Sequence, residues 1–419
     1  MTNEAIPTRF FGWWVVAAAF VVAIFGWGAG FYGPPIYLHA IVEKTGWPLT
    51  LVSSAVTVHF LIGAFVVANL PLLYRHFGLP VVTSLGAASL GIGVLGWSVC
   101  SVPWQIFVAA IESGVGWGAL GGAAINAMVA PWFVRHRPAA LSTAYNGASV
   151  GGILFSPLWV GLIGTLGFAH AAAAVGIVLA TTIAMLCMIV FSRTPDMMGQ
   201  SPDGSGGSLA PAPSIANPTS NPNRGLLLQD RRFLTLAGGM ALGLFAQIGL
   251  LAHLFSLLAP TFGAARAGVA MGGATAFAIL GRTAIGWLMP STADRRLVAC
   301  ASYGVQVMGS LVLVAGAGES MALLVGVMLF GFGIGNATSL PPLIAQAEFA
   351  KEEVQRIVSL IVAISQASYA FAPAAFGAIR SFGWNGIGAG RENATLFYLF
   401  AASIQLAAIA CFMLGRRRN

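Results

Sequence analysis

Apolar runs of about 20 residues recur from one end of this chain to the other, and each can cross a hydrocarbon core of roughly 30 Å as an α-helix. Of the 419 residues, 58% are hydrophobic and only 8% are charged. A soluble domain needs roughly a quarter of its residues charged to cover its surface, so a soluble fold is excluded. The strands of a membrane β-barrel alternate apolar and polar residues over about ten positions, and these runs do not, so a β-barrel is excluded as well. The sequence therefore predicts an all-α, multi-pass membrane protein.

Glycine, proline and charge clusters divide the chain into twelve predicted spans. These are residues 11–38, 49–74, 79–101, 104–132, 139–166, 168–192, 233–258, 264–289, 296–316, 320–345, 355–380 and 394–415. A stretch rich in Pro, Gly, Ser and Asn, 194–225, cannot bury a core and indicates a flexible linker. The predicted domains are a six-helix bundle over 1–193, a linker over 194–230 and a second six-helix bundle over 231–419.

Positive charge is distributed unevenly among the predicted loops. With the N-terminus inside, fifteen of the twenty Lys and Arg residues lie in cytoplasmic segments, whereas Lys44, Arg266, Arg380 and Arg391 lie outside. The positive-inside rule then predicts that both termini lie in the cytoplasm. The protein itself is expected in the cytoplasmic (inner) membrane. The net charge of +8 is thus a signal of topology and does not indicate a nucleic-acid partner.

The four cysteines, Cys100, Cys187, Cys300 and Cys411, stand singly among apolar residues, without a CxxC or Cys/His cluster. This pattern predicts neither disulfides nor a metal site, and no cofactor is expected. No nucleophile and base are spaced for catalysis, so an enzyme is not expected.

The two predicted bundles are related to each other in sequence. Residues 132–168 align without a gap with 348–384, so that Phe155 matches Phe371 and Pro157 matches Pro373. The glycine runs GVGWG (114–118) and GFGIG (331–335) also fall in corresponding places. A duplicated six-helix unit is typical of secondary transporters, which bind substrate near mid-membrane between the halves.

Six plus six spans, a long central loop and basic loops after even-numbered spans resemble the major facilitator superfamily over nearly the whole chain. Within it, FGWWVVAAAF (11–20) and WFVRHRPAALSTAYNGASVGG (132–152) resemble the monocarboxylate transporter and oxalate:formate antiporter group. The resemblance implies a monomeric transporter of a small organic anion, a mono- or dicarboxylate, that works by alternating access. Proton symport and anion exchange both remain open.

The chain also departs from the family pattern. In the loop after the second span, Arg75 occupies the usual Asp position and Pro71 the first Gly position, so different contacts are expected to hold that gate. In the loop after the eighth span, Asp294, Arg295 and Arg296 stand near the corresponding place. An Asp tied to lactate/H⁺ symport is replaced by Ala278, so symport by that route is not expected.

Two charged residues, Arg282 and Glu112, lie well inside the predicted hydrocarbon. Burying a charge there costs about 2.5–3.5 kcal/mol even on the lenient insertion scale, so both are expected to face a cavity. A guanidinium stays charged and fits a carboxylate with two hydrogen bonds, so Arg282 suits an anionic substrate. RTAIG (282–286) also resembles the R-x-x-x-G setting of the substrate-linked arginine in the transporter group. The alternative is an arginine that satisfies carbonyls at a helix end.

Glu112 is a candidate proton site, because a buried carboxylate can carry a proton at mid-membrane. His59 is a second proton-coupling candidate, and His253 is predicted to contact the substrate or to titrate with it. For each histidine the alternative is a packed interhelical contact. Tyr32, Tyr145, Asn146 and Tyr369 are predicted to line the substrate cavity, with interhelical hydrogen bonding as their alternative.

These features favour a carboxylate transporter. The eleven Trp and 27 Phe leave open the efflux of a hydrophobic or drug-like compound. A membrane sensor or scaffold that has lost transport is a third hypothesis, raised by the altered loop motif.

Overall fold

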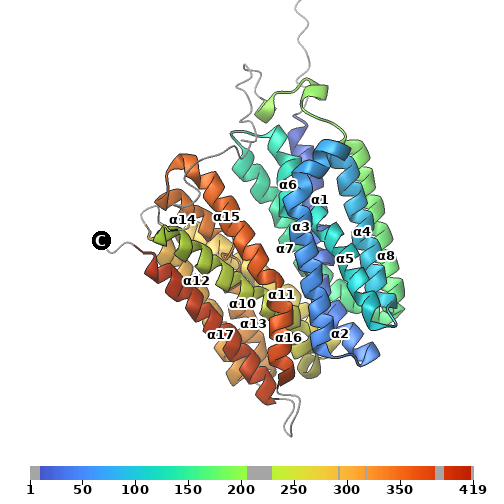
Figure 1. Ribbon diagram of the computed structural model, residues 1–419, viewed down its shortest axis with the longest axis vertical. Helices are drawn as coiled ribbons and strands as arrows, with labels where there is room; N and C mark the ends of the chain where they lie inside the picture. The colour runs from blue at the N-terminus through green and yellow to red at the C-terminus, as the bar shows by residue number, and fades with distance from the viewer. Residues whose placement is uncertain (1–9, 205–228, 291–292, 317–318, 383–390, 417–419) are drawn as a thin grey trace, which may run out of the picture.

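The computed structural model describes residues 10–204, 229–290, 293–316, 319–382 and 391–416. Throughout these ranges every regular element is a helix, as Figure 1 shows. Eleven helices are long and apolar enough to cross a membrane, and Ser320–Ile334 forms a shorter apolar helix. The prediction of an all-α, multi-pass membrane protein is confirmed.

The first half of the chain contains a run of helices that ends before the linker. They are α1 (Gly12–Gly30), α2 (Gly33–Thr45), α3 (Leu49–Phe77), α4 (Leu79–Val99), α5 (Pro103–Leu120), α6 (Gly122–Val129), the 3₁₀ turn η1 (Ala130–Trp132), α7 (Arg137–Leu166), α8 (Phe168–Leu186) and the π-helical turn η2 (Cys187–Phe191). The second half contains α10 (Arg231–Phe262), α11 (Ala264–Leu288), α12 (Arg295–Ala315), α13 (Ser320–Ile334), α14 (Leu340–Glu348), α15 (Lys351–Ala370), α16 (Ala372–Phe382) and α17 (Arg391–Leu414).

The predicted span 320–345 is divided into α13 and α14 by the non-helical residues 335–339, so α13 alone is too short to be among the eleven long spans. Proline has no N–H to donate and is tolerated in the first turn of a helix, and α14 has proline there. Gly335 and Asn336 precede this new start and favour a break. Three further spans are broken at the α1–α2, α5–α6 and α15–α16 junctions.

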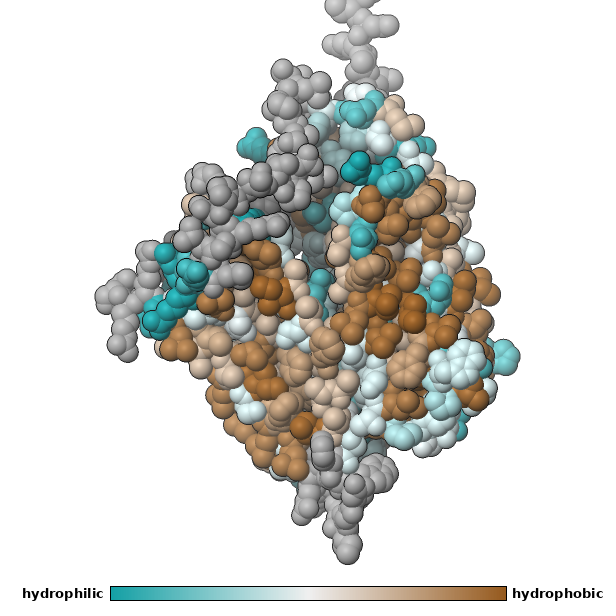
Figure 2. Space-filling model, viewed as in Figure 1, coloured by the Kyte–Doolittle hydropathy of each residue, from teal (hydrophilic) through white to brown (hydrophobic). Residues whose placement is uncertain are grey.

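The helices form two bundles, one from α1–α8 and one from α10–α17 (Figure 1). The bundles touch through α7 against α11, α3 against α16, and α2 against α10. In Figure 1, α2 and α16 lie at the lower end, whereas residues 196–204 lie at the upper end. Figure 2 shows the surface hollowed between the bundles in this upper part. The cleft therefore opens on the side of the linker and is closed at the other end.

The start of the predicted linker is docked on the first bundle, while residues 205–228 lie outside the described ranges. The turns η3 (Asp196–Met198) and η4 (Pro202–Gly204) belong to this start. The Asp203 carboxylate accepts hydrogen bonds from the backbone N–H groups of Val134, Arg135 and His136 at 3.1, 2.7 and 3.1 Å. Burial raises the pKa of Asp203, but these hydrogen bonds outweigh it and hold the pKa below its ordinary value. The carboxylate thus satisfies N–H groups that precede α7.

Candidate functional site

Arg282 lies on α11 and is half-buried. Its Nε donates a hydrogen bond of 2.8 Å to the carbonyl of Gly335, just after the end of α13. The backbones of α11 and of the segment after α13 lie very close together here. A Cβ added at either Gly281 or Gly335 would overlap a backbone carbonyl of the other segment. Among the described residues, no carboxylate pairs with Arg282, and no hydrogen bond involves its Nη1 or Nη2. The guanidinium therefore keeps most of its donors for another partner.

Tyr32 joins Arg282 from the other bundle. It lies at the α1–α2 break, and its hydroxyl interacts with the side chain of Thr275 and electrostatically with Arg282. Thr275 precedes Arg282 by seven residues and so lies on the same face of α11. Gly152 of α7 makes room, since a Cβ there would lie 2.6 Å from the Tyr32 ring. The structure thus brings Tyr32 and Arg282 together between the bundles, with Thr275 as a neighbour that the sequence did not single out.

An apolar pocket adjoins Tyr32. Both bundles contribute to its lining, which consists of Phe31, Tyr32, Pro34, Pro35, Val56, Phe60, Ile248, Leu251, Ala252 and Met271. The Phe60 ring contacts Tyr369 of α15 edge-on, with 6.0 Å between ring centroids. Tyr369 therefore lies across the bundle interface, against the aromatic wall of this pocket.

Tyr145 and Asn146 are neighbours on α7 with different surroundings. The Tyr145 hydroxyl donates to the carbonyl of Gly122 at 2.6 Å, at the α5–α6 break. Asn146 is exposed and lies seven residues before Ile153, on the same face of α7. A Cβ at Gly272 of α11 would lie 3.0 Å from the Ile153 carbonyl, so this face of α7 points toward α11.

The two histidines are buried and bonded within their own bundles. His59 is 1% exposed, and its Nδ1 and Nε2 each lie 2.9 Å from an oxygen, of Ser113 and Gly30 respectively. His253 is 0% exposed, and its Nε2 donates to the Pro373 carbonyl at 3.0 Å. The remaining nitrogen, His253 Nδ1, has no partner among the described residues. These positions match the interhelical alternative for both rings.

Glu112 lies half-buried on α5. Its carboxylate takes part in no ion pair with any described residue, because the four recorded pairs involve other acids.

One pattern connects four of the predicted residues. His59, Tyr145, His253 and Arg282 each bond a carbonyl at or beside one of the four breaks, namely those of Gly30, Gly122, Pro373 and Gly335. A helix that ends inside a membrane leaves its last carbonyls without intrahelical partners, and His59 and Arg282 satisfy those of Gly30 and Gly335 at the ends of α1 and α13. Tyr145 and His253 bond the first turns of α6 and α16 instead, and for Arg282 this role accounts for only one of its donors.

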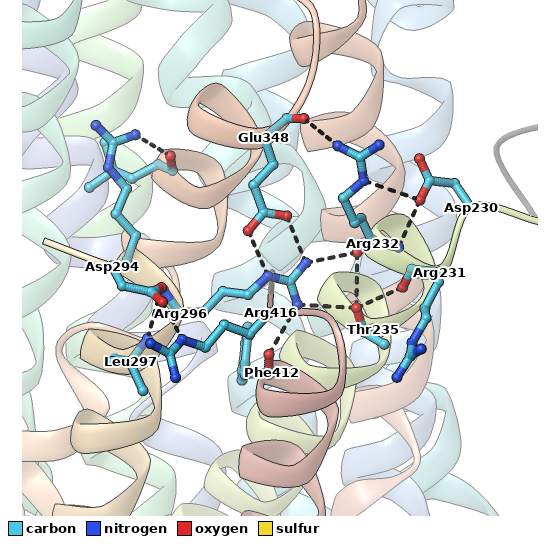
Figure 3. Close-up of polar contacts among 12 residues, drawn as sticks. Asp230, Arg231, Arg232, Thr235, Asp294, Arg296, Leu297, Glu348, Phe412 and Arg416 are labelled. Atoms are coloured by element: carbon cyan, nitrogen blue, oxygen red, sulfur yellow. Dashed lines mark hydrogen bonds and ion pairs between the residues drawn. The ribbon is translucent and has the colours of Figure 1, made fainter. Parts of the chain in front are cut away.

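The sequence pointed to Arg296 but missed the partners that hold it at the linker end of the second bundle. Arg296 is 1% exposed, and its Nε and Nη2 donate to the two carboxylate oxygens of Glu348 at 2.6 and 2.8 Å (Figure 3). The same guanidinium donates to Thr235 Oγ1, the Phe412 carbonyl and the Arg232 carbonyl. These contacts tie α10, α12, α14 and α17 together. The DRR triplet at 294–296 was the available signal, but its partner Glu348 lies 52 residues away.

A second pocket lies against the α13–α14 break. Ser302, Tyr303, Gln306 and Asn336 line it, and each has a buried polar atom with no hydrogen-bond partner among the described residues. Such orphaned groups cost free energy, so this junction is less well satisfied than the Arg296 region.

Comparison with known proteins supplies the remaining evidence. A family model, "Major Facilitator Superfamily", matches residues 18–373. None of the curated proteins compared with the chain matches it. A mutant of the nucleoside transporter NupG superposes with a TM-score of 0.74 at 11% identity, covering 96% of this chain and 100% of that one. A bacterial homolog of the human lysosomal transporter Spinster, inward-facing and occupied, has a TM-score of 0.72 at 12% identity, covering 97% of each chain. At such identities the likeness shows a shared fold.

Proposed function

Because this chain belongs to the major facilitator superfamily, we propose that it carries a small organic anion, a mono- or dicarboxylate, across the cytoplasmic membrane by alternating access. Membership makes the protein a multi-pass membrane transporter and not an enzyme. The proposal includes twelve spans, with α13 and α14 together as the tenth, and bundles over 1–193 and 231–419. It also places the linker side in the cytoplasm and treats the protein as a monomer.

The observation that carries the proposal is the guanidinium of Arg282. A buried charge without a counter-ion is costly, and here the described acceptor is one neutral carbonyl. A substrate carboxylate would supply the missing charge and accept two parallel hydrogen bonds from the remaining donors. We propose that the anion reaches Arg282 through the cleft on the linker side.

Tyr32 extends the site to the first bundle. Its hydroxyl lies near Arg282 and Thr275 but belongs to the opposite half. An anion held by both side chains would bind more tightly when the halves close around it than when they are apart. A ligand shifts a conformational equilibrium only through such a difference in affinity. This gives the substrate a physical means of driving the change from one open side to the other.

Coupling to protons is assigned to Glu112. Of the three titratable candidates, His59 and His253 are engaged by neighbouring groups, whereas the Glu112 carboxylate has no described ion-pair partner. A Glu112→Gln variant should then keep anion exchange and lose uptake driven by a proton gradient. If the protein works only by anion exchange, wild type and Glu112→Gln should show equal anion uptake under a proton gradient.

Efflux of a hydrophobic compound is the second candidate function. The pocket lined by Phe31, Phe60 and Met271 is apolar and favours it. A charged guanidinium next to this pocket disfavours lipophilic cations and is compatible with amphipathic acids.

Uptake of radiolabelled carboxylates into proteoliposomes tests the proposal. Wild type is expected to accumulate at least one mono- or dicarboxylate, and Arg282→Gln to lose about 100-fold or more of that rate. Arg266→Gln, which removes an exposed charge from the same helix, is the matched control. A lipophilic cation and a nucleoside complete the panel, the latter because a structural neighbour is a nucleoside transporter. Carboxylate uptake by Arg282→Gln at the wild-type rate would remove the basis of the proposal.

A further inference from the structure

Another guanidinium lies at the closed end of the protein, away from the linker. Arg380 on α16 was expected at an outer span end, yet the structure half-buries it against α10. Its Nη1 donates to Ser256 Oγ at 2.5 Å, and its Nη2 lies 3.5 Å from the Ser256 carbonyl. Both acceptors are neutral. Among the described residues, no carboxylate pairs with Arg380.

The groups around Arg380 include hydrogen-bonding side chains and one carboxylate, that of Glu43, which pairs with His39 and not with Arg380. Tyr398 and His39 both interact electrostatically with Arg380. The Glu43 carboxylate lies 3.5 Å from His39 Nε2 within α2. Ser256 Oγ donates to the carbonyl of His253 at 2.9 Å and so links Arg380 to that histidine. His253 is fully buried, and its Nδ1 has no partner among the described residues. One unpartnered ring nitrogen and one guanidinium without a described carboxylate partner therefore share one region.

Direct contacts join the two bundles next to this region. The backbone N–H of Ala374 in α16 donates to Thr57 Oγ1 in α3 at 3.1 Å. One turn away along each helix, a Cβ at Gly377 would overlap the Ser53 side chain, so α16 and α3 are in direct contact there. Arg380 follows Ala374 and Gly377 on α16, so it lies beside the contacts that close the protein at the end away from the linker.

We propose that Arg380, together with Ser256, forms an anion-binding station at the end of the protein away from the linker. A half-buried guanidinium whose acceptors among the described residues are neutral is stabilised by an anion, and its remaining donors suit a carboxylate or a small inorganic anion such as chloride. A positive group at the mouth of a transport route also raises the local concentration of anions. The station therefore collects the substrate before the gate opens toward Arg282. That last step rests on the proposed function, but anion binding at Arg380 does not.

Thermal unfolding of the purified full-length protein tests anion binding without requiring transport. Chloride and formate, compared with gluconate at equal ionic strength, should raise the Tm of wild type, Arg282→Gln and Arg266→Gln. Arg380→Gln should lose this chloride-dependent rise. Arg380→Lys keeps the charge and should regain it at higher chloride, which also distinguishes loss of binding from misfolding. An equal rise in Arg380→Gln and wild type overturns the proposal.

Transport kinetics identify the anion. If the substrate is the ligand, Arg380→Gln should raise the KM measured from the side away from the linker about tenfold, because a charge-assisted hydrogen bond is lost. The KM from the linker side and the control Arg266→Gln should stay within about twofold of wild type. If chloride alone is the ligand, both KM values stay unchanged while the thermal effect persists, and only the collecting role fails. If wild type moves no anion but retains the Arg380-dependent stabilisation, the proposed function fails and the station stands.

Glu392 provides one more discriminating variant, because it is an acid close in sequence to this end of the second bundle. If Glu392→Gln loses the chloride-dependent rise in Tm as Arg380→Gln does, the counter-ion is a protein carboxylate and the proposal is wrong. A wild-type response in Glu392→Gln supports it.

Discussion

Arg296 and Arg282 belong to the same bundle, yet their surroundings differ in one decisive way. Arg296 holds the Glu348 carboxylate with two hydrogen bonds and donates to three further oxygens (Figure 3). Arg282 has one hydrogen bond to a neutral carbonyl, from its Nε. The protein supplies the counter-ion in the first case. In the second case, our account assigns that part to the substrate.

The comparison separates a structural arginine from a binding arginine. A buried ion pair with all its hydrogen bonds made is costly to break, because the remaining partner becomes an isolated charge. A guanidinium with unused donors contributes less to stability and keeps its binding capacity for a ligand. Substitutions in the two regions should therefore affect stability and transport in opposite proportions.

The largest effect on stability is expected from Glu348→Gln. It leaves Arg296 buried without a carboxylate and should lower the free energy of unfolding by about 3–5 kcal/mol. Thermal unfolding in detergent measures this, with the exposed Glu319→Gln as the control. Equal stability of the two variants would show that the ion pair in Figure 3 contributes little.

Ala278→Asp makes the Arg282 region resemble the Arg296 region. Residue 278 lies one turn before Arg282, and carboxylate and guanidinium groups at this spacing face each other. The new carboxylate should occupy the free donors and weaken binding of an anionic substrate by about tenfold or more. Ala278→Asn, of the same size but uncharged, is the control for steric damage at this buried position. Identical KM values for the two variants would argue against competition for Arg282.

A smaller effect on stability should distinguish a tyrosine hydroxyl that has a hydrogen-bond partner from one that has none among the described residues. Tyr145→Phe removes the hydrogen bond to the Gly122 carbonyl and should cost about 0.5–1.5 kcal/mol of stability. Tyr303→Phe removes a buried hydroxyl that has no described partner and should be neutral within about 0.5 kcal/mol or slightly stabilising. The difference in Tm between the two variants is the measurement. A larger loss for Tyr303→Phe would mean that its hydroxyl is satisfied in the membrane.

Composition and apolar run length predicted the all-α membrane fold, because burial in a bilayer imposes a strong and local pattern. The breaks were harder to predict. Gly121 and the prolines at 341 and 342 favour them, but the division at 335–339 depends on how closely α11 approaches. For this reason the span predicted at 320–345 is two helices.

The candidate site shows the same limit. Arg282 stood out because an intramembrane charge is rare, and Tyr32 was selected from its neighbourhood in the chain. Thr275, Glu348 and the burial of Arg380 were missed, since their roles depend on partners 52 or more residues away, or on the opposite bundle. For His59 and His253 the sequence left a functional role and an interhelical contact both open, and their carbonyl partners became visible only in the structure.

The central claim is that the free donors of Arg282 bind the substrate carboxylate, and direct binding to purified protein tests it. Titration calorimetry with the transported carboxylate should give a measurable Kd for wild type and for Arg266→Gln. For Arg282→Gln the Kd should rise about 100-fold or become undetectable, while the Tm without ligand falls only slightly because one hydrogen bond is lost. A Kd for Arg282→Gln within about twofold of wild type would contradict the account.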